Sequence, residues 1–506
     1  MNRKVILATV FFTGAAVLVI EVTATRILAP YFGNTLYTVS SIIAVILGAL
    51  SIGYYFGGIL ADKNPDYRRF FYIIIVAAIF CLLIQLFSVS ILKDLGYVLN
   101  IKWGPLIVSM IIFFIPSALL GMLSPYAVKL ISHDLATAGR DSGMIFFLST
   151  LGSITGSLIT GFYLIPNYGV SAIIIATALF LFIIGAIGIF LFRISSTEKS
   201  FLKMEIAILC GILGIMIGMM MLIFATSKRD DSTIFQKDGL YGRIRITTQE
   251  INNRPALNLY IDRTREGAVY TDSYELPVRY ANYYSLYQLI NPEMKTALFL
   301  GGGLYSMPRA LLMDSQDIEN VDVAEIDPEL YILARKYFNL VEDRRLTNNV
   351  GDGRRFLIET NNKYEMIFAD VYYSLYSIPV HFTTREFFQL AKSKLADNGF
   401  FAMNVIGSLD ENKNDFLLSE FKTFQSVFKN SYIFSDSPKG KGIQNFIFLG
   451  IKDEGYNLDL IAGHSRLPII GDLADKIINP ADLPLNTAII LTDDYSPVEK
   501  LTADTF

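Results

Sequence analysis

The stretch Thr296-Ala-Leu-Phe-Leu-Gly-Gly-Gly303 decides the fold of the C-terminal half of this chain. Its first part, Thr296 to Leu300, is a short and mostly apolar run, which predicts a buried strand, and a helix is predicted to begin near Met307. Glycines between a strand and a helix let the backbone approach a ligand closely at the positive end of the helix. The stretch therefore predicts an α/β domain whose first strand leads into a nucleotide-type site.

Apolar strands alternate with helical stretches beyond these glycines, which is typical of a parallel, doubly wound sheet. The last two strands are joined by a glycine-rich loop and are expected to form a terminal hairpin. The predicted strands are Thr296 to Leu300, Val321 to Ile326, a run ending at Val350, Tyr364 to Asp370, Phe400 to Val405, Tyr432 to Ser435 and Phe446 to Gly450, and the predicted helices include Met307 to Met313 and Glu329 to Phe338.

The N-terminal half is too apolar for an ordinary soluble domain. The 506 residues are 52% hydrophobic, with a mean hydropathy of +0.43. A membrane-spanning helix needs roughly 20 apolar residues, and small residues four apart let such helices pack closely, as at Gly53/Gly57, Gly152/Gly156 and Gly214/Gly218. We predict a helical bundle of about seven spans: Val5 to Leu28, Tyr37 to Leu60, Phe70 to Leu92, Pro105 to Leu123, Met144 to Ile165, Val170 to Phe192 and Ile206 to Thr226.

Three domains follow from these patterns. Residues 1–228 form the polytopic transmembrane domain, because charged residues become frequent from Ser227 onward. Residues 229–291 read as short alternating strands and predict a small β-rich subdomain. Residues 292–506 form the α/β domain.

Acidic residues follow the next two strands of the α/β domain. Glu325 stands at the end of the second strand, where a carboxylate can bind ribose hydroxyls, and Asp352-Gly353 follows the third. A dinucleotide fingerprint would carry Gly or Ala at the sixth position from the first glycine, but that position is Ser306. The pattern favours an adenosyl-sulfonium ligand over NAD.

Four motifs in order resemble those of the spermidine synthases, the polyamine aminopropyltransferases, of which membrane-fused members exist. The resemblance covers roughly residues 233 to 450. It rests on Leu298-Phe-Leu-Gly-Gly-Gly, Val323-Ala-Glu-Ile-Asp-Pro, Val350-Gly-Asp-Gly-Arg-Arg-Phe-Leu and Tyr364-Glu-Met-Ile-Phe-Ala-Asp.

The resemblance implies a Rossmann-like domain of the S-adenosylmethionine-methyltransferase type. It also implies a ligand that is S-adenosylmethionine or its decarboxylated form, with no metal. The residues implied to contact this ligand are Gly301, Gly302, Gly303, Glu325, Ile326, Asp352 and Gly353, and Asp370 is implied to lie beside the reacting centre.

Two acids of the spermidine synthase pattern are missing. Leu304 follows the glycines where the family usually has Asp, and Tyr373 stands where the family has a second Asp, which is associated with deprotonating the attacking amine. An amine with a pKa near 10 is mostly cationic at neutral pH and must lose a proton before it attacks. Putrescine is therefore a doubtful substrate.

Other side chains are candidates to replace those acids. Tyr372 and Tyr373 are candidate substrate ligands, Tyr373 being also a candidate catalytic residue. His381 is a candidate base or substrate ligand because histidine ordinarily titrates near neutral pH; the alternative is a structural histidine. Asp493 and Asp494 are candidate ligands at the mouth of the site or, alternatively, part of a solvated turn.

The predicted function is a membrane-anchored transferase that moves an aminopropyl or other alkyl group to a nucleophilic acceptor. Two alternatives stay open: a methyltransferase acting on a lipid or membrane-delivered molecule, and an adenosyl-metabolite sensor coupled to a transporter-like bundle. The comparison of the bundle with a transporter rests on Gly57 to Lys63 with Arg68 and Arg69, which resemble a loop of major facilitator transporters.

The expected partners are a small-molecule acceptor, the lipid bilayer and a second copy of the chain in a homodimer. The net charge of −4 argues against a nucleic-acid partner. The acceptor is expected to be either membrane-delivered or anionic. An anionic acceptor is suggested by basic residues at alternating positions of two predicted strands; alternatively, these residues lie on solvent-exposed strand edges. These residues are Arg243, Arg245, Arg263 and Arg265.

Basic residues are concentrated on the same side of the predicted spans as the N-terminus, which predicts a cytoplasmic N-terminus. Seven spans would then place the α/β domain outside the cell, away from the cytosolic supply of S-adenosyl compounds. We expect a multi-pass protein of the cell membrane with a cytoplasmic α/β domain, and one span that is re-entrant or miscounted.

Overall fold

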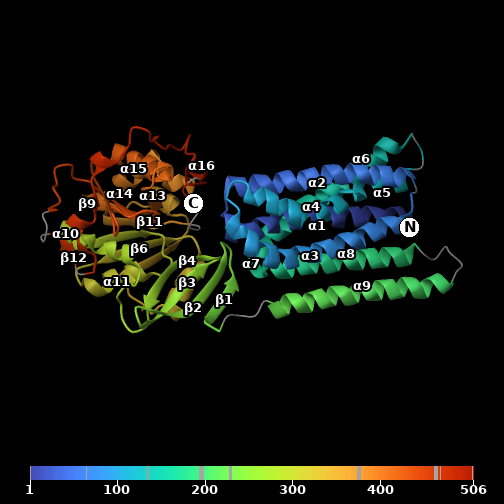
Figure 1. Cartoon of the computed structure of the whole chain (residues 1–506), viewed down its shortest axis with the longest axis horizontal. Helices are drawn as coiled ribbons and strands as arrows, with labels where there is room; N and C mark the ends of the chain where they lie inside the picture. The colour runs from blue at the N-terminus through green and yellow to red at the C-terminus, as the bar shows by residue number, and fades with distance from the viewer. Residues whose placement is uncertain are drawn as a thin grey trace. The chain divides into compact units, whose positions relative to one another are not determined.

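The computed structural model describes residues 2–505 apart from 64, 133, 135, 193–198, 227–230, 373–377, 461–464, 468 and 504. The chain divides into two compact units (Figure 1). One unit comprises Met1–Asp230 with Asp238–Leu240, and the other comprises Asp231–Lys237 with Tyr241–Phe506.

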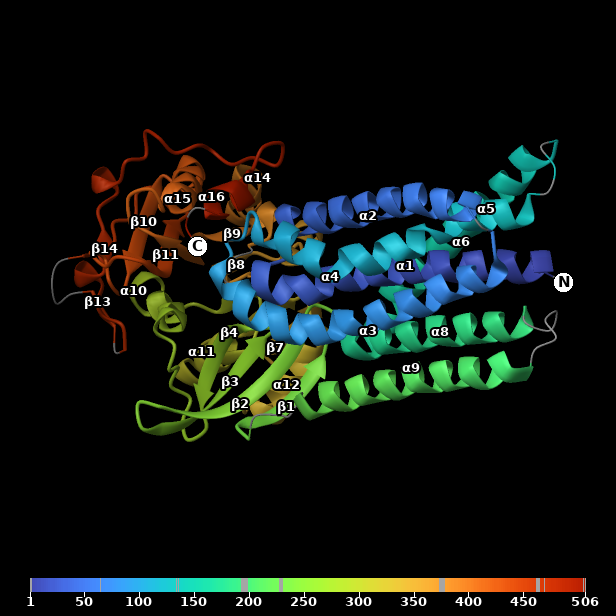
Figure 2. The ribbon, with the colours of Figure 1, turned by 45° about the vertical axis from the view of Figure 1, so that its right-hand side comes forward.

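The N-terminal unit is a bundle of long helices (Figure 2). In the described part of the chain, six segments are long and apolar enough to cross a membrane: Arg3–Phe32, Leu36–Lys63, Tyr67–Leu92, Gly104–Ile131, Ala138–Asn167 and Val170–Leu191. The helices are α1 Asn2–Phe32, α2 Leu36–Lys63, α3 Tyr67–Val98, α4 Gly104–Gly121, α5 Leu123–Ile131, α6 Ala138–Ile159, η1 Thr160–Leu164, α7 Ile165–Asn167, α8 Val170–Leu191 and α9 Lys199–Thr226.

The described residues contain six such segments, one fewer than the roughly seven predicted spans. The seventh predicted span, Ile206 to Thr226, falls within α9, where the apolar stretch among the described residues is only Ile208–Met221. The whole of α9, Lys199–Thr226, is a helix of 28 residues.

Glycines bring two helix pairs of the bundle into close contact. A Cβ atom on Gly152 would lie 1.9 Å from the carbonyl oxygen of Phe11 in α1, and one on Gly53 would lie 2.2 Å from that of Ala118 in α4. Larger residues would therefore separate these helices, as expected where backbone contact drives packing. The third predicted pair, Gly214 and Gly218, has no such neighbour within 4 Å among the residues that the structure describes.

The C-terminal unit begins with a four-stranded antiparallel sheet in the order β1-β2-β3-β4. Its strands are β1 Thr233–Asp238, β2 Arg243–Ile251, β3 Arg254–Ile261 and β4 Thr264–Tyr270. A 3-10 helix, η2 Arg279–Leu286, and α10 Tyr287–Ile290 lead from this sheet into the second one.

The second sheet has eight strands in the order β14-β10-β11-β9-β8-β5-β6-β7. The predicted parallel pairing holds for β7-β6-β5-β8-β9, whereas β11 pairs antiparallel with both β9 and β10, so the sheet is mixed. The strands are β5 Thr296–Leu300, β6 Asn320–Glu325, β7 Leu346–Val350, β8 Tyr364–Ala369, β9 Leu395–Ser408, β10 Asn430–Ser435, β11 Ile443–Ile451 and β14 Ile477–Ile478, and the principal helices are α11 Ser306–Asp314, α12 Pro328–Tyr337, α13 Gly353–Glu359, α14 Arg385–Lys394 and α15 Asp415–Val427.

The order of the second sheet fixes the place of the site. From β5 the chain continues to β6 on one side, and β8 pairs with β5 on the other. In open α/β sheets, ligands bind beyond the carboxyl ends of the strands where the order reverses in this way. The glycine stretch after β5 and Asp370 after β8 both lie at that point.

Helix α15 contains a fully buried carboxyl group at Glu420. Both of its carboxylate oxygens lack a hydrogen-bond partner among the described residues, and burial raises the pKa of Glu420 well above its ordinary value. Above the unfolded-state pKa of about 4.3, the folded protein therefore binds more protons than the unfolded chain. The Glu420 contribution to stability falls as pH rises from there.

We expect Glu420→Met to raise the stability of this unit by about 1–3 kcal/mol, because a buried charge without a partner is replaced by an apolar side chain of similar size. The gain over wild type is larger at pH 8 than at pH 5. Thermal unfolding of the full chain, followed by circular dichroism at both pH values, checks this. The exposed Glu411, mutated to Met, is the control; an unchanged or lower melting temperature for the Glu420 variant would contradict the prediction.

Candidate active site

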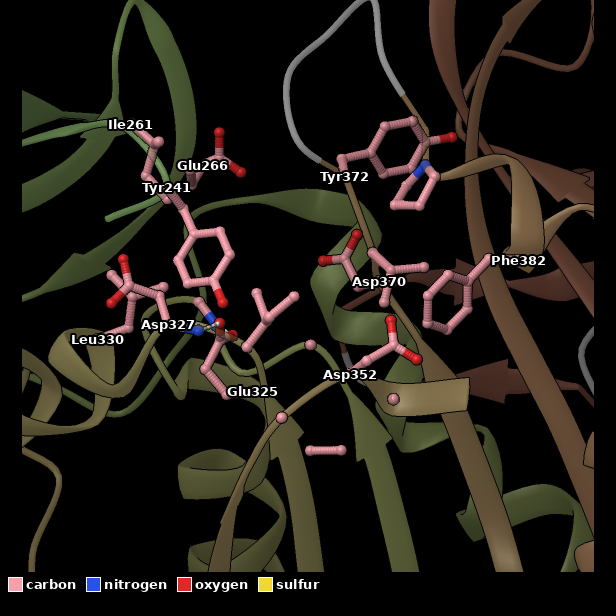
Figure 3. A pocket seen from close by; sticks show the side chains of 18 residues that line it. Tyr241, Ile261, Glu266, Glu325, Asp327, Leu330, Asp352, Asp370, Tyr372 and Phe382 are labelled. Atoms are coloured by element: carbon pink, nitrogen blue, oxygen red, sulfur yellow. Dashed lines mark hydrogen bonds between the residues drawn. The ribbon is translucent and has the colours of Figure 1, made fainter. Parts of the chain in front are cut away.

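A pocket of about 760 Å³, its open mouth included, lies beyond the carboxyl ends of β5, β6 and β8 (Figure 3). The residues that line the pocket are Tyr241, Ile261, Glu266, Gly301, Gly303, Ala324, Glu325, Ile326, Asp327, Leu330, Gly351, Asp352, Gly353, Asp370, Val371, Tyr372, Pro379 and Phe382.

Gly301 is held in a conformation that only glycine adopts readily. Its φ is +91°, and a Cβ atom there would lie 2.2 Å from the carbonyl oxygen of Asp370. A side chain at this position would force the ends of β5 and β8 apart. The turn therefore brings the backbone after β5 against Asp370, and Gly303 follows with a φ of +50°.

Glu325 at the end of β6 organises this turn. One of its carboxylate oxygens accepts the backbone N–H groups of Gly302 and Gly303 at 2.7 and 3.0 Å, and the other accepts that of Asp327 at 2.8 Å. Burial raises the pKa of Glu325, although the three N–H donors act against the shift. Three of roughly four acceptor positions are thus occupied, which leaves about one for a ligand.

Asp352 lines the pocket at the start of α13. It caps the helix by accepting the N–H of Arg355, and its other oxygen lies 2.8 Å from Nε2 of His381. Burial acts to raise the pKa of Asp352, but hydrogen bonds from His381 and the backbone outweigh burial and lower it. The structure thus places His381 against Asp352, outside the residues that line the pocket.

Asp370 lies at the end of β8 with both carboxylate oxygens occupied. Tyr280 donates its hydroxyl to one oxygen at 3.0 Å, and Asn404 donates its amide to the other at 2.9 Å. Burial raises the pKa of Asp370, while these two hydrogen bonds act against the shift. Sequence reasoning missed both partners; the amide of Asn404 within the apolar strand Phe400 to Val405 was the only signal.

Of the remaining predicted site residues that the structure describes, one lines the pocket and two do not. Tyr372 lines the pocket and accepts the backbone N–H of Ile406, whereas Tyr373 lies outside the described residues. Asp493 forms a two-pronged ion pair with Arg354 at 2.7 and 2.6 Å, away from the pocket lining. Asp494 is exposed and does not line the pocket either.

Glu266 on β4 was missed by the sequence reasoning. It is partly buried and lines the pocket, and its Oε1 has no hydrogen-bond partner among the described residues. Figure 3 shows its carboxyl group facing the same space as those of Asp370, Glu325 and Asp352. Strand alternation gave a signal, because Glu266 must face away from Arg265, its neighbour on β4.

The pocket is strongly acidic. Among the described residues that line it, five carry carboxyl groups and none is a lysine, arginine or histidine. The four arginines that suggested an anionic acceptor lie elsewhere; for instance, the guanidinium of Arg245 stacks over the ring of Tyr260 at 4.7 Å. The arrangement is thus suited to a ligand that carries positive charge.

Comparison with known proteins matches the spermine/spermidine synthase domain to residues 286–437. A polyamine aminopropyltransferase of Vibrio vulnificus is 30% identical over 149 residues, which cover 29% of this chain and 48% of that protein. A probable polyamine aminopropyl transferase of Bifidobacterium longum is 27% identical over 223 residues, 41% of this chain and 48% of that protein.

A crystal structure of a probable spermidine synthase from Corynebacterium glutamicum aligns with 53% of this chain and 99% of its own, at 20% identity and a TM-score of 0.44. The alignments with the first two relatives span about half of the length of those proteins. The glycine turn, Glu325, Asp352 and Asp370 all lie within the matched segment. Residues 286–437 of this chain are thus similar to a spermine/spermidine synthase domain, and six long apolar helices among the described residues precede them.

Proposed function

We propose that the α/β unit transfers an aminopropyl group from decarboxylated S-adenosylmethionine to an amine acceptor. The observation that carries this proposal is the set of five carboxyl groups around the pocket, without a basic residue among the described lining residues. The decarboxylated donor carries a sulfonium and an amine and has no carboxylate. Intact S-adenosylmethionine would bring a carboxylate into this acidic space with no counter-charge.

The pocket residues fit the two ends of such a donor. The backbone after β5 and the carboxylate of Glu325 would hold the ribose, with Asp352 near the adenine. Asp370 and Glu266 would face the cationic end of the donor and the ammonium group of the acceptor. The rate would come mainly from holding the amine in line with the carbon to be attacked.

We further propose that the six long helices anchor the protein in the cell membrane, with the α/β unit on the cytoplasmic side. Six spans return the chain to the side of the N-terminus, which the distribution of basic residues makes cytoplasmic. In this proposal α9 does not cross the membrane, which removes the conflict raised by seven spans. Protection of the C-terminal unit from protease in intact cells is expected; cleavage from outside would overturn this arrangement.

The test of the activity uses the full chain in detergent or nanodiscs. Calorimetry should show decarboxylated S-adenosylmethionine binding at least about tenfold more tightly than the intact compound, a difference of about 1.4 kcal/mol. Methylthioadenosine release with a panel of mono-, di- and triamines should then identify acceptors. Tighter binding of the intact compound, or transfer of a methyl group, would overturn the proposal.

A further inference from the structure

The acceptor amine has to lose a proton before it can attack, and the pocket must supply the group that takes it. The two family positions that would carry acids are Leu304 and Tyr373 in this chain. Leu304 is apolar, and a tyrosine with an ordinary pKa near 10 is a weak base at neutral pH. A proton acceptor is therefore needed from another element.

Three of the pocket carboxylates are already engaged by hydrogen-bond donors. Asp370 accepts from Tyr280 and Asn404. Glu325 accepts three backbone N–H groups, and Asp352 is held by His381 and the N–H of Arg355. Donors of this kind stabilise the charged form of a carboxylate and reduce its affinity for a proton.

Glu266 differs from these three. Its Oε1 is buried and has no hydrogen-bond partner among the described residues, although the side chain lines the pocket. We propose that Glu266 is the catalytic residue that takes the proton from the acceptor amine. The inference rests on the proposed function and assigns to β4 a role that relatives place on the loop after β8.

The electrostatic surroundings of Glu266 suit this role. Burial raises the pKa of Glu266 well above its ordinary value, and the neighbouring charges of Asp370, Glu325 and Asp262 act in the same direction. A carboxylate with a raised pKa is a stronger base, and it transfers protons most effectively when its pKa lies near the working pH.

Leu304 is consistent with a base on β4. Its side chain packs on Gly267, the neighbour of Glu266: Cδ1 lies 2.5 Å from where a Cβ atom on Gly267 would be. An aspartate at position 304 would bring a further negative charge close to that stretch of β4. Leu304 is instead buried and apolar, so this position adds no charge beside β4.

The proposed step is proton transfer to Glu266 followed by displacement at the aminopropyl carbon. The acceptor enters as an ammonium ion, and the carboxylate of Glu266 takes one N–H proton to become a neutral acid. The freed lone pair attacks the aminopropyl carbon bonded to the sulfonium. A C–N bond forms as the C–S bond breaks, and the electron pair of that bond goes to sulfur, giving neutral methylthioadenosine and a secondary ammonium product. The proton on Glu266 returns to solvent when the products leave.

The test compares Glu266→Gln with wild type in the full chain, using an amine acceptor found with the wild-type protein. At pH 7.5 we expect kcat to fall by about 100- to 1,000-fold, within the range of general base catalysis, while the affinity for methylthioadenosine changes less than threefold. The loss should shrink as pH approaches the amine pKa of about 10, where the acceptor deprotonates without help. Glu266→Asp should recover part of kcat.

Glu250→Gln is the matched control, because Glu250 is an exposed glutamate in the same four-stranded sheet. Preserved methylthioadenosine binding shows that each variant is folded. A Glu266→Gln variant that keeps more than a tenth of kcat, or that loses activity through KM alone with an unchanged pH profile, would overturn this inference. Absence of turnover in the wild-type protein with every amine would instead overturn the proposed function itself.

Discussion

Replacing Asp370 with asparagine is expected to lower kcat/KM for aminopropyl transfer by about 1,000-fold, the scale of removing one well-placed electrostatic group from a dry site. Asp370 is the carboxylate at the end of β8, directly against the backbone of Gly301. Its negative charge faces the place where cationic donor and acceptor would meet. An amide keeps the shape and removes the charge.

The variant is expected to fold, which makes its activity interpretable. The new amide oxygen can still accept the amide N–H of Asn404, and the new NH₂ group can donate to the hydroxyl oxygen of Tyr280. Burial raises the pKa of Asp370, so loss of the charge does not lower stability. We expect an unchanged or higher melting temperature.

The measurement is initial-rate kinetics over a range of amine concentrations, with thermal unfolding as the check on folding. Tyr280→Phe is the matched comparison: it removes one hydrogen bond to the same carboxylate and leaves the charge, so a loss of about tenfold or less is expected. An Asp370→Asn variant with more than a tenth of wild-type kcat/KM would contradict a role for this charge in the reaction.

The parallel part of the second sheet could be predicted because its signals are local. The apolar run from Thr296 to Leu300 matches β5, and the glycines that follow it mark a turn that no other residue forms easily. Glu325 ends β6 and Asp352 follows shortly after β7, so strand order alone brings them to one edge. Six of the predicted spans correspond to long apolar segments of the described chain, and the seventh falls on α9, where the apolar stretch among the described residues is Ile208–Met221.

The acceptor side could not be predicted in the same way. Glu266 and Tyr280 precede the glycine turn in sequence, and they reach Asp370 only through the fold of the first sheet and η2. No local sequence pattern predicts that these two residues lie close to Asp370. His381 was singled out for its side-chain chemistry, yet the structure places it against Asp352, a contact that depends on how α13 and the segment before α14 pack.

The acidity of the pocket also bears on how the chain departs from its relatives. Two acids are missing from the motif positions, yet five carboxyl groups still line the described pocket. Glu266 lies on a strand outside the matched segment of residues 286–437. A comparison restricted to the motifs therefore understates the negative charge available to an acceptor.

The largest expected effect on binding is that of Glu325→Gln, which should weaken methylthioadenosine binding by about 100-fold, or about 2.7 kcal/mol. Glu325 accepts N–H groups on both oxygens: two from the glycine turn and one from Asp327. A glutamine can accept on one side only. Its NH₂ group would then face an N–H donor on the other side, and two donors cannot bond each other.

The expected consequence is a glycine turn that loses its anchor on β6, because a buried N–H without an acceptor costs about 1–3 kcal/mol. Isothermal titration calorimetry with methylthioadenosine measures the effect. Glu329→Gln is the matched control, since Glu329 on α12 pairs with Lys237 at the surface and does not line the pocket. Binding by the Glu325 variant within threefold of wild type would mean that the turn holds its shape without the carboxylate, and that the nucleoside is held by other residues.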